Sequence, residues 1–405
     1  MCAGSNRTDR VRVGFIINFD FDSWLGGFNY LKTLIDSVMA LPERTIEPVI
    51  FTGKQNYQRI SEAFPNNEIV ISGMTDRWSL PWTLRMMFML ILRHDFFLDS
   101  LFKKHSIRIL SHAGLTDSYS GFPSLCWIPD FQHRRLPDFF SPWQKMVRDR
   151  RFTKLCRLSG GVILSSRDAQ ETLKEFYPKA VEKSFVLNFV TRPDDGYDAA
   201  PLDALLNKYR ISFPYFHVPN QFWGHKNHRL IVEALRILRE NGKTVHVVAT
   251  GNTSDYRKSG VYANLMKQVD DYGLADSFKS LGVIPYRDLM AIMWHSVAVI
   301  NPSFFEGWST TVEEAKSMGK KVILSDIPVH REQNPERGVF VDPENPDELA
   351  DALEKALNET DIGEEMKYAD NAKKDLPNRR DAFGEKYQAI VLMVLKSLQC
   401  QRDKT

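Results

Sequence analysis

Short apolar runs alternate with longer amphipathic stretches in the first half of the chain. The apolar runs are rich in β-branched and aromatic residues and predict strands, while the segments between them repeat apolar residues at helical spacing, as over 28–40 and 140–158. This alternation is typical of βαβ units and predicts a parallel sheet. The strand-like runs are 11–19, 47–53, 67–73, 107–113, 124–130 and 161–166.

A second alternating series follows a polar interruption. Residues 191–201 (TRPDDGYDAAP) concentrate proline, glycine and aspartate without periodicity, which predicts a surface linker. The chain is therefore predicted to form two doubly wound, Rossmann-like α/β domains, over 1–195 and 205–375. The strand-like runs of the second series are 215–220, 244–252, 277–282, 297–303, 321–326 and 338–343.

Length and composition agree with two soluble cores and exclude some functions. The 405 residues carry 53 basic and 51 acidic side chains, so the formal net charge of +2 lacks the basic surplus of a dedicated nucleic-acid binder. The four cysteines have no metal-binding spacing, and we expect Cys126 and Cys156 to be core residues in a reducing compartment. The polar start MCAGSNRTDR does not resemble a secretory signal, so we expect a cytoplasmic protein.

The segment from Asn301 to Ala315 combines groups that suit a nucleotide sugar. Glu306 follows a strand-like run, and serine and threonine at 309–311 predict a helix start, with Glu314 inside that helix. Helix amides bind anionic phosphate oxygens, and carboxylates accept hydrogen bonds from sugar hydroxyls. Ligands of parallel sheets bind beyond the carboxyl ends of the strands, so we expect the site in the cleft between the two sheets.

These residues resemble a known family. NPSFFEGWSTTVEEAKSMGKKVILSD (301–326) is similar to the donor-binding segment of retaining glycosyltransferases of family 4, in which two glutamates are separated by seven residues. The resemblance extends to GGFNYLKTLID (26–36), PNQFWGHKNHRLIVEAL (219–235) and the closing helix. It implies the GT-B fold, with residues 376–405 forming a helix that crosses back to the first domain. One departure is Ser309, where the family usually has glycine.

The resemblance also implies residue roles. Glu306 would bind the donor hexose and Glu314 the ribose, while Ser309, Thr310 and Thr311 would present helix amides to the diphosphate. Lys226 matches the family's diphosphate-binding lysine and would stabilise the leaving group. The arginine that often precedes this lysine is missing, and Asn220, Gln221 and His225 are the candidates to share its role. Without the flanking pattern, Glu306 and Glu314 would be interpreted as solvent-exposed carboxylates.

Two further places carry candidate residues of the first domain. Gly26 and Gly27 follow the first strand-like run, where missing side chains let backbone amides approach a donor or an acceptor. WIPDFQHRRLPDFF (127–140) resembles the family's acceptor-side loop, but Pro129 occupies the usual histidine position. Asp130 or His133 would then contact the reacting sugar or orient the acceptor hydroxyl.

No metal or other cofactor is expected, because the family's mechanism needs none. Asp20 and Asp22 form a DxD motif, which we interpret as incidental in this sheet. The predicted reaction is retaining transfer of a hexose-type sugar (mannosyl, glucosyl or rhamnosyl-like) from a nucleotide diphosphate sugar to a glycan or lipid-linked acceptor in surface polysaccharide assembly. Two alternatives stay open: a nucleotide-sugar epimerase or phosphorylase of the same fold, and an inactive glycan-binding relative. No strand is followed by GxGxxG, which disfavours an oxidoreductase.

Two segments raise the question of membrane contact. Residues 145–157 carry six basic side chains against one acid and could rest on anionic lipid. Residues 77–97 are apolar and aromatic but are interrupted by Arg85 and are too short to span a bilayer, so they predict a buried or interfacial helix. The alternative is a solvated helix face for the first segment and a core helix for the second. An anionic membrane surface, with the protein peripheral at its inner face, is thus a candidate partner.

Overall fold

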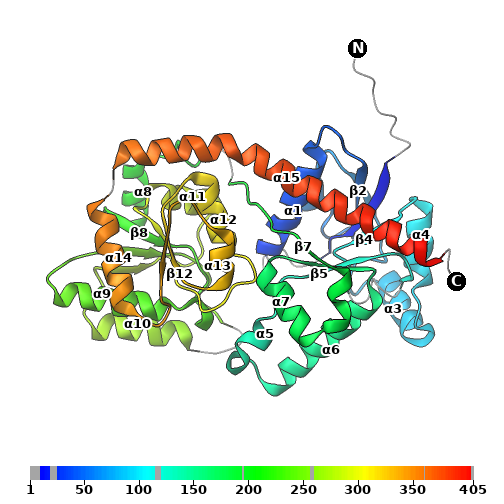
Figure 1. Cartoon of the computed structure of the whole chain (residues 1–405), viewed down its shortest axis with the longest axis horizontal. Coiled ribbons are helices and arrows are strands. Elements are labelled where there is room, and N and C mark those ends of the chain that lie inside the picture. Colours follow the sequence, from blue (N-terminus) through cyan, green and yellow to red (C-terminus); the bar gives the residue numbers. More distant parts are fainter. Residues whose placement is uncertain are drawn as a thin grey trace, which may run out of the picture. The chain divides into compact units, whose positions relative to one another are not determined.

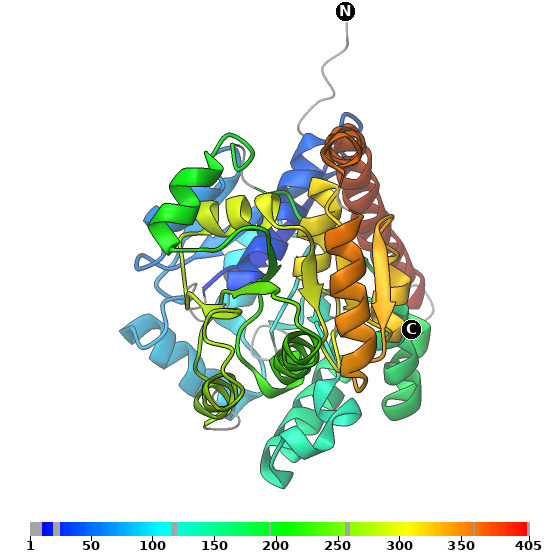
Figure 2. The ribbon, with the colours of Figure 1, turned by 90° about the vertical axis from the view of Figure 1, so that its left-hand side faces the viewer.

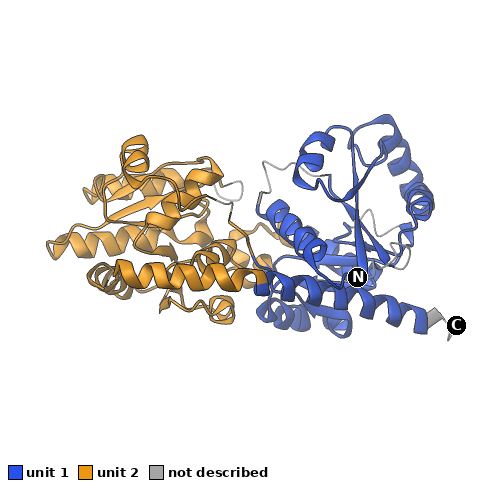
Figure 3. Cartoon of the chain, turned by 90° about the horizontal axis from the view of Figure 1, so that it is seen from above, with its two compact units in different colours: residues 1–131, 146–190, 378–405 blue, residues 132–145, 191–377 orange. Residues whose placement is uncertain are grey.

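The computed structural model describes residues 10–18, 25–114, 120–193, 196–255, 260–359 and 361–402. The chain divides into two compact units, coloured separately in Figure 3. Unit 1 comprises residues 1–131, 146–190 and 378–405, and unit 2 comprises 132–145 and 191–377. Asp20 and Asp22, the incidental DxD motif, lie outside the described residues.

Unit 1 is built on parallel strands. Four of them form a sheet in the order β3-β2-β1-β4, and three form a sheet in the order β5-β6-β7. A parallel bridge between Leu110 and Ser124 joins β4 to the start of β5, so the two sheets continue one another. The strands are β1 (Val11–Ile16), β2 (Ile46–Thr52), β3 (Glu68–Ile71), β4 (Ile109–Ser111), β5 (Leu125–Ile128), β6 (Gly161–Leu164) and β7 (Ser184–Val186).

The helices of unit 1 alternate with these strands (Figure 1). Cys126 on β5 and Cys156 on α6 are buried in the same apolar cluster, as expected for core residues. A second cluster packs Leu98 and Phe102 of α4 against β2 and β4. The helices are α1 (Leu25–Ala40), α2 (Tyr57–Ala63), α3 (Leu80–Leu92), α4 (Phe96–Lys104), α6 (Pro142–Leu158), whose first turn belongs to unit 2, α7 (Arg167–Phe176) and the 3-10 helix η4 (Pro178–Lys183).

Unit 2 contains a six-stranded parallel sheet in the order β10-β9-β8-β11-β12-β13. The chain builds outward from β8 in one direction and from β11 in the other, so the neighbours β8 and β11 flank the topological switch point. Open sheets of this kind bind ligands beyond the carboxyl ends of the strands at such a point. The strands are β8 (Tyr215–Val218), β9 (His246–Ala249), β10 (Phe278–Ser280), β11 (Val299–Asn301), β12 (Val322–Ser325) and β13 (Gly338–Val341).

Helices cover both faces of this sheet (Figure 2). Successive strand residues face opposite sides, so Phe216 and Ile300 pack with α9, α10 and α14, whereas Val299 packs with α11 and α12. The predicted doubly wound α/β architecture is therefore confirmed. The helices are α5 (Gln132–Arg135), α8 (Leu202–Tyr209), α9 (His228–Glu240), α10 (Val261–Asp271), α11 (Tyr286–His295), α12 (Thr310–Met318), α13 (Pro328–Gln333) and α14 (Pro346–Asn358), with 3-10 helices η3 (Pro137–Phe139) and η5 (Gly224–Lys226).

One long helix, α15 (Ile362–Arg402), contributes to both units (Figure 1). Its residues up to Pro377 belong to unit 2 and those from Asn378 onward to unit 1. In unit 1 the Tyr387 hydroxyl donates to Ser111 Oγ at 2.6 Å, and Val394 packs so closely on Gly161 that a Cβ there would lie 3.0 Å from its side chain. The final helix is thus part of the core of unit 1.

The apolar segment 77–97 differs from the core alternative. In α3 only Arg85 and Met89 are buried, and the large apolar side chains mostly face solvent. The segment is therefore not a core helix. Among the described residues, no helix has both the length and the apolar character needed to cross a membrane.

Candidate functional site

Polar side chains meet at the switch point of unit 2, beyond the carboxyl ends of β8 and β11. Asn220 Nδ2 donates to Asn301 Oδ1 at 3.3 Å, and Ser303 Oγ lies 2.6 Å from the same oxygen. Asn301 Nδ2 in turn donates to Ser309 Oγ at 2.8 Å. Asn301 thus fixes the loop that connects β11 to α12.

A buried ion pair lies beside this network. Lys226 Nζ is 2.6 Å from Glu306 Oε1, and the Ser303 hydroxyl donates to the same carboxylate oxygen at 2.7 Å. Burial by itself would raise the pKa of Glu306, but the Lys226 ammonium outweighs this effect and lowers the pKa to about 2. Glu306 is therefore ionised at neutral pH although only 8% of its surface is exposed.

Ser309 caps helix α12. Its hydroxyl accepts from the Val312 amide at 3.4 Å, while Gln333 accepts from the Ser309 amide at 3.1 Å and donates to the Ser309 carbonyl at 3.0 Å. The first amides of a helix have no partner within it. With the Val312 amide occupied by the cap, Thr310 and Thr311 supply the remaining amides of the first turn. The hydroxyl in place of glycine thus has a structural role.

Glu314 lies in the second turn of α12 and is buried together with Glu313. The Tyr286 hydroxyl donates to Glu314 Oε1 at 2.9 Å. Glu313 instead accepts from Gln333 Nε2 at 3.0 Å. The alternative of solvent-exposed carboxylates is therefore wrong for Glu306 and Glu314, and the two neighbouring glutamates have different environments.

Two residues of α13 support the site and were missed by the sequence analysis. His330 is buried, and its Nδ1 lies 2.9 Å from the Ser325 carbonyl; burial lowers its pKa, so the ring is neutral. Gln333 bonds Ser309 and Glu313, as described above. Both follow β12, more than 20 residues beyond Ser309, and no spacing in the sequence links them to it.

The other predicted residues lie in separate places. Gly26 and Gly27 form the first turn of α1 in unit 1, and a Cβ on Gly26 would meet nothing within 4 Å. The loop expected there is thus already helical. Asp130 follows β5 in unit 1, whereas His133 lies on α5 in unit 2 and is fully buried, with its ring edge against Phe140.

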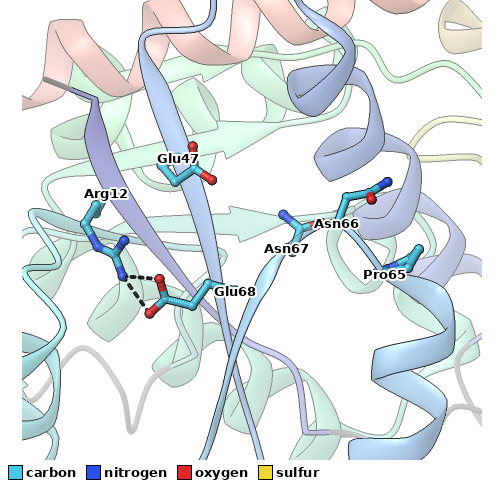
Figure 4. A pocket seen from close by; sticks show the side chains of 6 residues that line it. All are labelled: Arg12, Glu47, Pro65, Asn66, Asn67 and Glu68. Atoms are coloured by element: carbon cyan, nitrogen blue, oxygen red, sulfur yellow. Dashed lines mark hydrogen bonds and ion pairs between the residues drawn. The ribbon is translucent and has the colours of Figure 1, made fainter. Parts of the chain in front are cut away.

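A cavity lies at the amino ends of strands β1, β2 and β3 of unit 1 (Figure 4). Its volume is about 550 Å³, and Arg12 Nη2 contacts both carboxylate oxygens of Glu68 at 2.8 Å. Ligands of open parallel sheets bind beyond the carboxyl ends of the strands. This cavity lies at the amino ends, so it is not the expected ligand site. It is lined by Arg12, Glu47, Pro65, Asn66, Asn67 and Glu68.

No cluster of three or more histidine, cysteine or acidic side chains that could hold a metal occurs in the part of the chain that the structure describes. In unit 2, Lys226 and the first amides of α12 can together bind an anionic group and neutralise its charge. The carboxylates Glu306 and Glu314 can accept hydrogen bonds from hydroxyl groups on either side of it.

Comparisons with known proteins indicate a glycosyltransferase. Residues 212–375 match the family model described as glycosyl transferases group 1. The chain is 26% identical over 154 residues to an O-antigen chain mannosyltransferase of Salmonella typhimurium, and this alignment spans 36% of the chain and 41% of the relative.

Solved structures show the same fold over nearly the whole chain. A glycosyltransferase from Rickettsia africae has a TM-score of 0.66 at 16% identity, covering 96% of this chain and 99% of its own. Anabaena HepE in complex with UDP-glucose has a TM-score of 0.61 at 14% identity, covering 98% and 100%. The chain therefore has the GT-B fold, as the sequence predicted, and residues 212–375 are similar to glycosyl transferases of group 1.

Proposed function

We propose that the chain transfers a hexose-type sugar from a nucleoside diphosphate sugar to a glycan or lipid-linked acceptor, with retention of the anomeric configuration. The observation that carries the proposal is the buried pair Lys226–Glu306 at the switch point, next to the start of α12. It places a cation, helix amides and an ionised carboxylate within one small region. A sugar diphosphate requires these three kinds of group.

Each residue then has a role. Lys226 and the first amides of α12 hold the diphosphate and stabilise the negative charge that develops as it leaves. Glu306 accepts hydrogen bonds from hydroxyls of the sugar, and Glu314, oriented by Tyr286, accepts them from the ribose. Asn220 orients the loop through Asn301, in place of the missing arginine. Asp130 and His133 remain candidates on the acceptor side, and Gly26 and Gly27 remain candidates for contacts of the first unit with the donor.

The reaction breaks the bond between the anomeric carbon and the diphosphate oxygen, and the nucleoside diphosphate leaves with the electron pair. The acceptor oxygen attacks the anomeric carbon from the same face, and its proton passes to the departing phosphate oxygen. No resident metal or cofactor takes part in this scheme. The protein contributes positioning and charge stabilisation.

The existing contacts prepare the site for the donor. Lys226 is neutralised by Glu306, so neither buried charge is left alone. When the diphosphate arrives, the Lys226 ammonium can turn to it while Ser303 retains its hydrogen bond to Glu306. Glu306 then has a free lone pair for the sugar.

The donor base can be narrowed by binding measurements. HepE of Anabaena was solved with UDP and with UDP-glucose, so uridine diphosphate sugars are the first candidates. A thermal-shift panel of nucleoside diphosphates and their sugars should give one base a larger stabilisation than the others, because a ligand that binds only the folded state raises the melting temperature.

Surface polysaccharide assembly is the proposed setting, because the Salmonella relative is named as an O-antigen chain mannosyltransferase. We propose a lipid-linked acceptor, which would bring the enzyme to an anionic membrane surface as a peripheral protein.

The decisive experiment compares products with and without a glycan acceptor. We expect nucleoside diphosphate and an elongated acceptor from the unmodified chain, no transfer by Glu306→Ala, and a sharply lowered turnover by Lys226→Ala. An epimerase would convert the donor without an acceptor, and an inactive relative would bind the glycan and leave the donor intact. Normal transfer by both variants would refute the assignment of the site.

A further inference from the structure

An apolar surface on unit 1, formed by α3 and the start of α4, has no counterpart elsewhere among the described residues. Ten of the 21 large hydrophobic side chains that the described residues leave exposed fall within residues 78–97. We name this surface the α3–α4 patch. It comprises Trp78, Leu80, Leu84, Met87, Phe88, Leu90, Ile91, Leu92, Phe96 and Phe97.

In helix α3 the charged side chain faces inward and most of the large apolar side chains face solvent. Its one charged side chain, Arg85, points inward, where its Nε lies 2.6 Å from the buried carboxylate of Asp95. The outward residues Leu80, Leu84, Met87 and Ile91 repeat at intervals of three and four, so they form one continuous stripe. A surface helix in water has the opposite arrangement, with charges outward and apolar residues inward.

The Arg85–Asp95 pair makes further contacts beneath the patch. Arg85 Nη1 also donates to the Met74 carbonyl at 3.0 Å, and Asp95 Oδ1 accepts from the Leu98 amide and caps α4. Arg93, in the left-handed conformation, ends α3 between them. The ion pair therefore fixes α3 to α4, and the exposed apolar side chains are part of a defined surface.

The charges around the patch indicate what covers it. Arg77 and Arg93 are exposed at the two ends of α3, while Asp95, the only carboxylate within residues 77–97, is buried in its ion pair. Trp78 and Trp82 lie together at one end, with ring centroids 5.2 Å apart, and Arg77 lies over the Trp78 ring. Tryptophan and arginine around an apolar stripe are typical of the interface between lipid headgroups and acyl chains.

We propose that the α3–α4 patch docks on an anionic lipid bilayer, with α3 lying in the plane of the interface. The apolar stripe enters the acyl boundary, and Arg77 and Arg93 contact lipid phosphates. Thirteen residues make α3 about 20 Å long, which suits a helix that lies on a membrane and is too short for one that crosses it.

A second copy of the chain fits the α3–α4 patch less well than a lipid bilayer does. Two copies paired through this patch would bring arginines together with no exposed carboxylate in the segment to answer them, whereas lipid phosphates neutralise them. The inference gives a contact surface to the membrane association included in the proposed function. Membrane docking is tested without donor or acceptor, so a failure of docking does not decide whether the chain transfers sugar, and the reverse is also true.

The test is sedimentation of the full chain with vesicles. We expect binding to vesicles of phosphatidylcholine with phosphatidylglycerol and weak binding to phosphatidylcholine alone. Leu90→Glu combined with Ile91→Glu, at side chains 66% and 69% exposed, should weaken binding at least about 100-fold, because two apolar side chains are lost from the interface. Arg77→Gln should weaken it about fivefold.

Matched controls separate the patch from general effects of added charge. Ile362→Glu combined with Met393→Glu, at exposed apolar positions of α15, should leave vesicle binding unchanged. Folding of each variant is checked by its melting temperature, which exposed positions should alter little. Arg150→Glu combined with Lys154→Glu tests the basic run on α6, whose exposed side chains are the other candidate for lipid contact.

Three results would overturn the proposal. The first is no association of the unmodified chain with anionic vesicles. The second is binding that survives the substitutions at 90 and 91 but is lost with those at 150 and 154. The third is a dimer in sedimentation velocity without lipid that the substitutions at 90 and 91 dissociate, since the patch would then belong to a second copy.

Discussion

Replacing Glu306 with glutamine should destabilise unit 2 in a pH-dependent way. The carboxyl has an ordinary pKa of 4.5, which falls to about 2 in the folded chain because of the Lys226 ammonium. Each pKa unit is worth about 1.4 kcal/mol, so ionised Glu306 contributes about 3 kcal/mol at pH 7. Glutamine keeps the size of the side chain but leaves the Lys226 ammonium without its buried counter-charge.

The sign of the pH dependence follows from the lowered pKa. The contribution of Glu306 is complete above pH 4.5, the value in the unfolded chain, and is lost as the pH falls toward 2. The gap in stability between the unmodified chain and Glu306→Gln should therefore be constant from pH 7 to about pH 5.5 and should narrow by about 1 kcal/mol at pH 4. Above pH 5.5 this group adds no pH dependence.

Hydrogen exchange of the β8 and β11 amides in increasing urea measures this gap for unit 2 alone, which matters because a two-unit chain need not unfold in one step. Glu336→Gln, at an exposed carboxylate of the same unit, is the matched control and should change the stability little. A gap of less than about 1 kcal/mol at pH 7, or one that stays constant down to pH 4, would contradict the assigned ion pair.

Three further predictions concern single contacts. Ser309→Ala removes the cap of α12 and should lower the stability of unit 2 by about 1 kcal/mol in urea unfolding. Ser309→Gly should lower it by only a few tenths of a kcal/mol. Equal losses of stability in the two variants would argue against the cap. Tyr286→Phe removes the hydrogen bond to Glu314 and should raise the donor KM several-fold with kcat nearly unchanged in a transfer assay, since ribose contacts are equal in ground and transition states; a fall in kcat alone would contradict this role. Arg85→Met leaves the buried Asp95 carboxylate unpaired and should destabilise unit 1 by about 3 kcal/mol, and an unchanged melting temperature would show that the pair is dispensable.

The sequence was sufficient for the architecture because strands buried on both faces read as continuous apolar runs. VAVIN and KVILSD were predicted as strands, and the structure places them as β11 and β12, which both lie inside the six-stranded sheet. Glu306, Ser309 and Glu314 were found because they occur within nine residues of one another. Short spacing along the chain was therefore enough to predict the centre of the candidate site.

Contacts between distant segments could not be predicted from the sequence. Gln333 holds both the backbone of Ser309 and the carboxylate of Glu313, yet it comes from a helix after the next strand. The apolar run 77–97 has the composition of a core helix, yet in the structure Arg85 faces inward to Asp95 and most of the large apolar side chains face outward. Periodicity gives the faces of a helix but not which face the protein covers.

The shared helix α15 also sets the order in which the two units can be completed during synthesis. The ribosome makes all of unit 2 before it reaches residues 378–402, which supply Phe383, Tyr387, Ile390, Val391 and Val394 to the core of unit 1. The unit that begins first is therefore finished last, and its apolar surface around Gly161 stays open while the later unit folds. A chain truncated after Pro377 should hold a folded unit 2 and an unfinished unit 1 that binds chaperones.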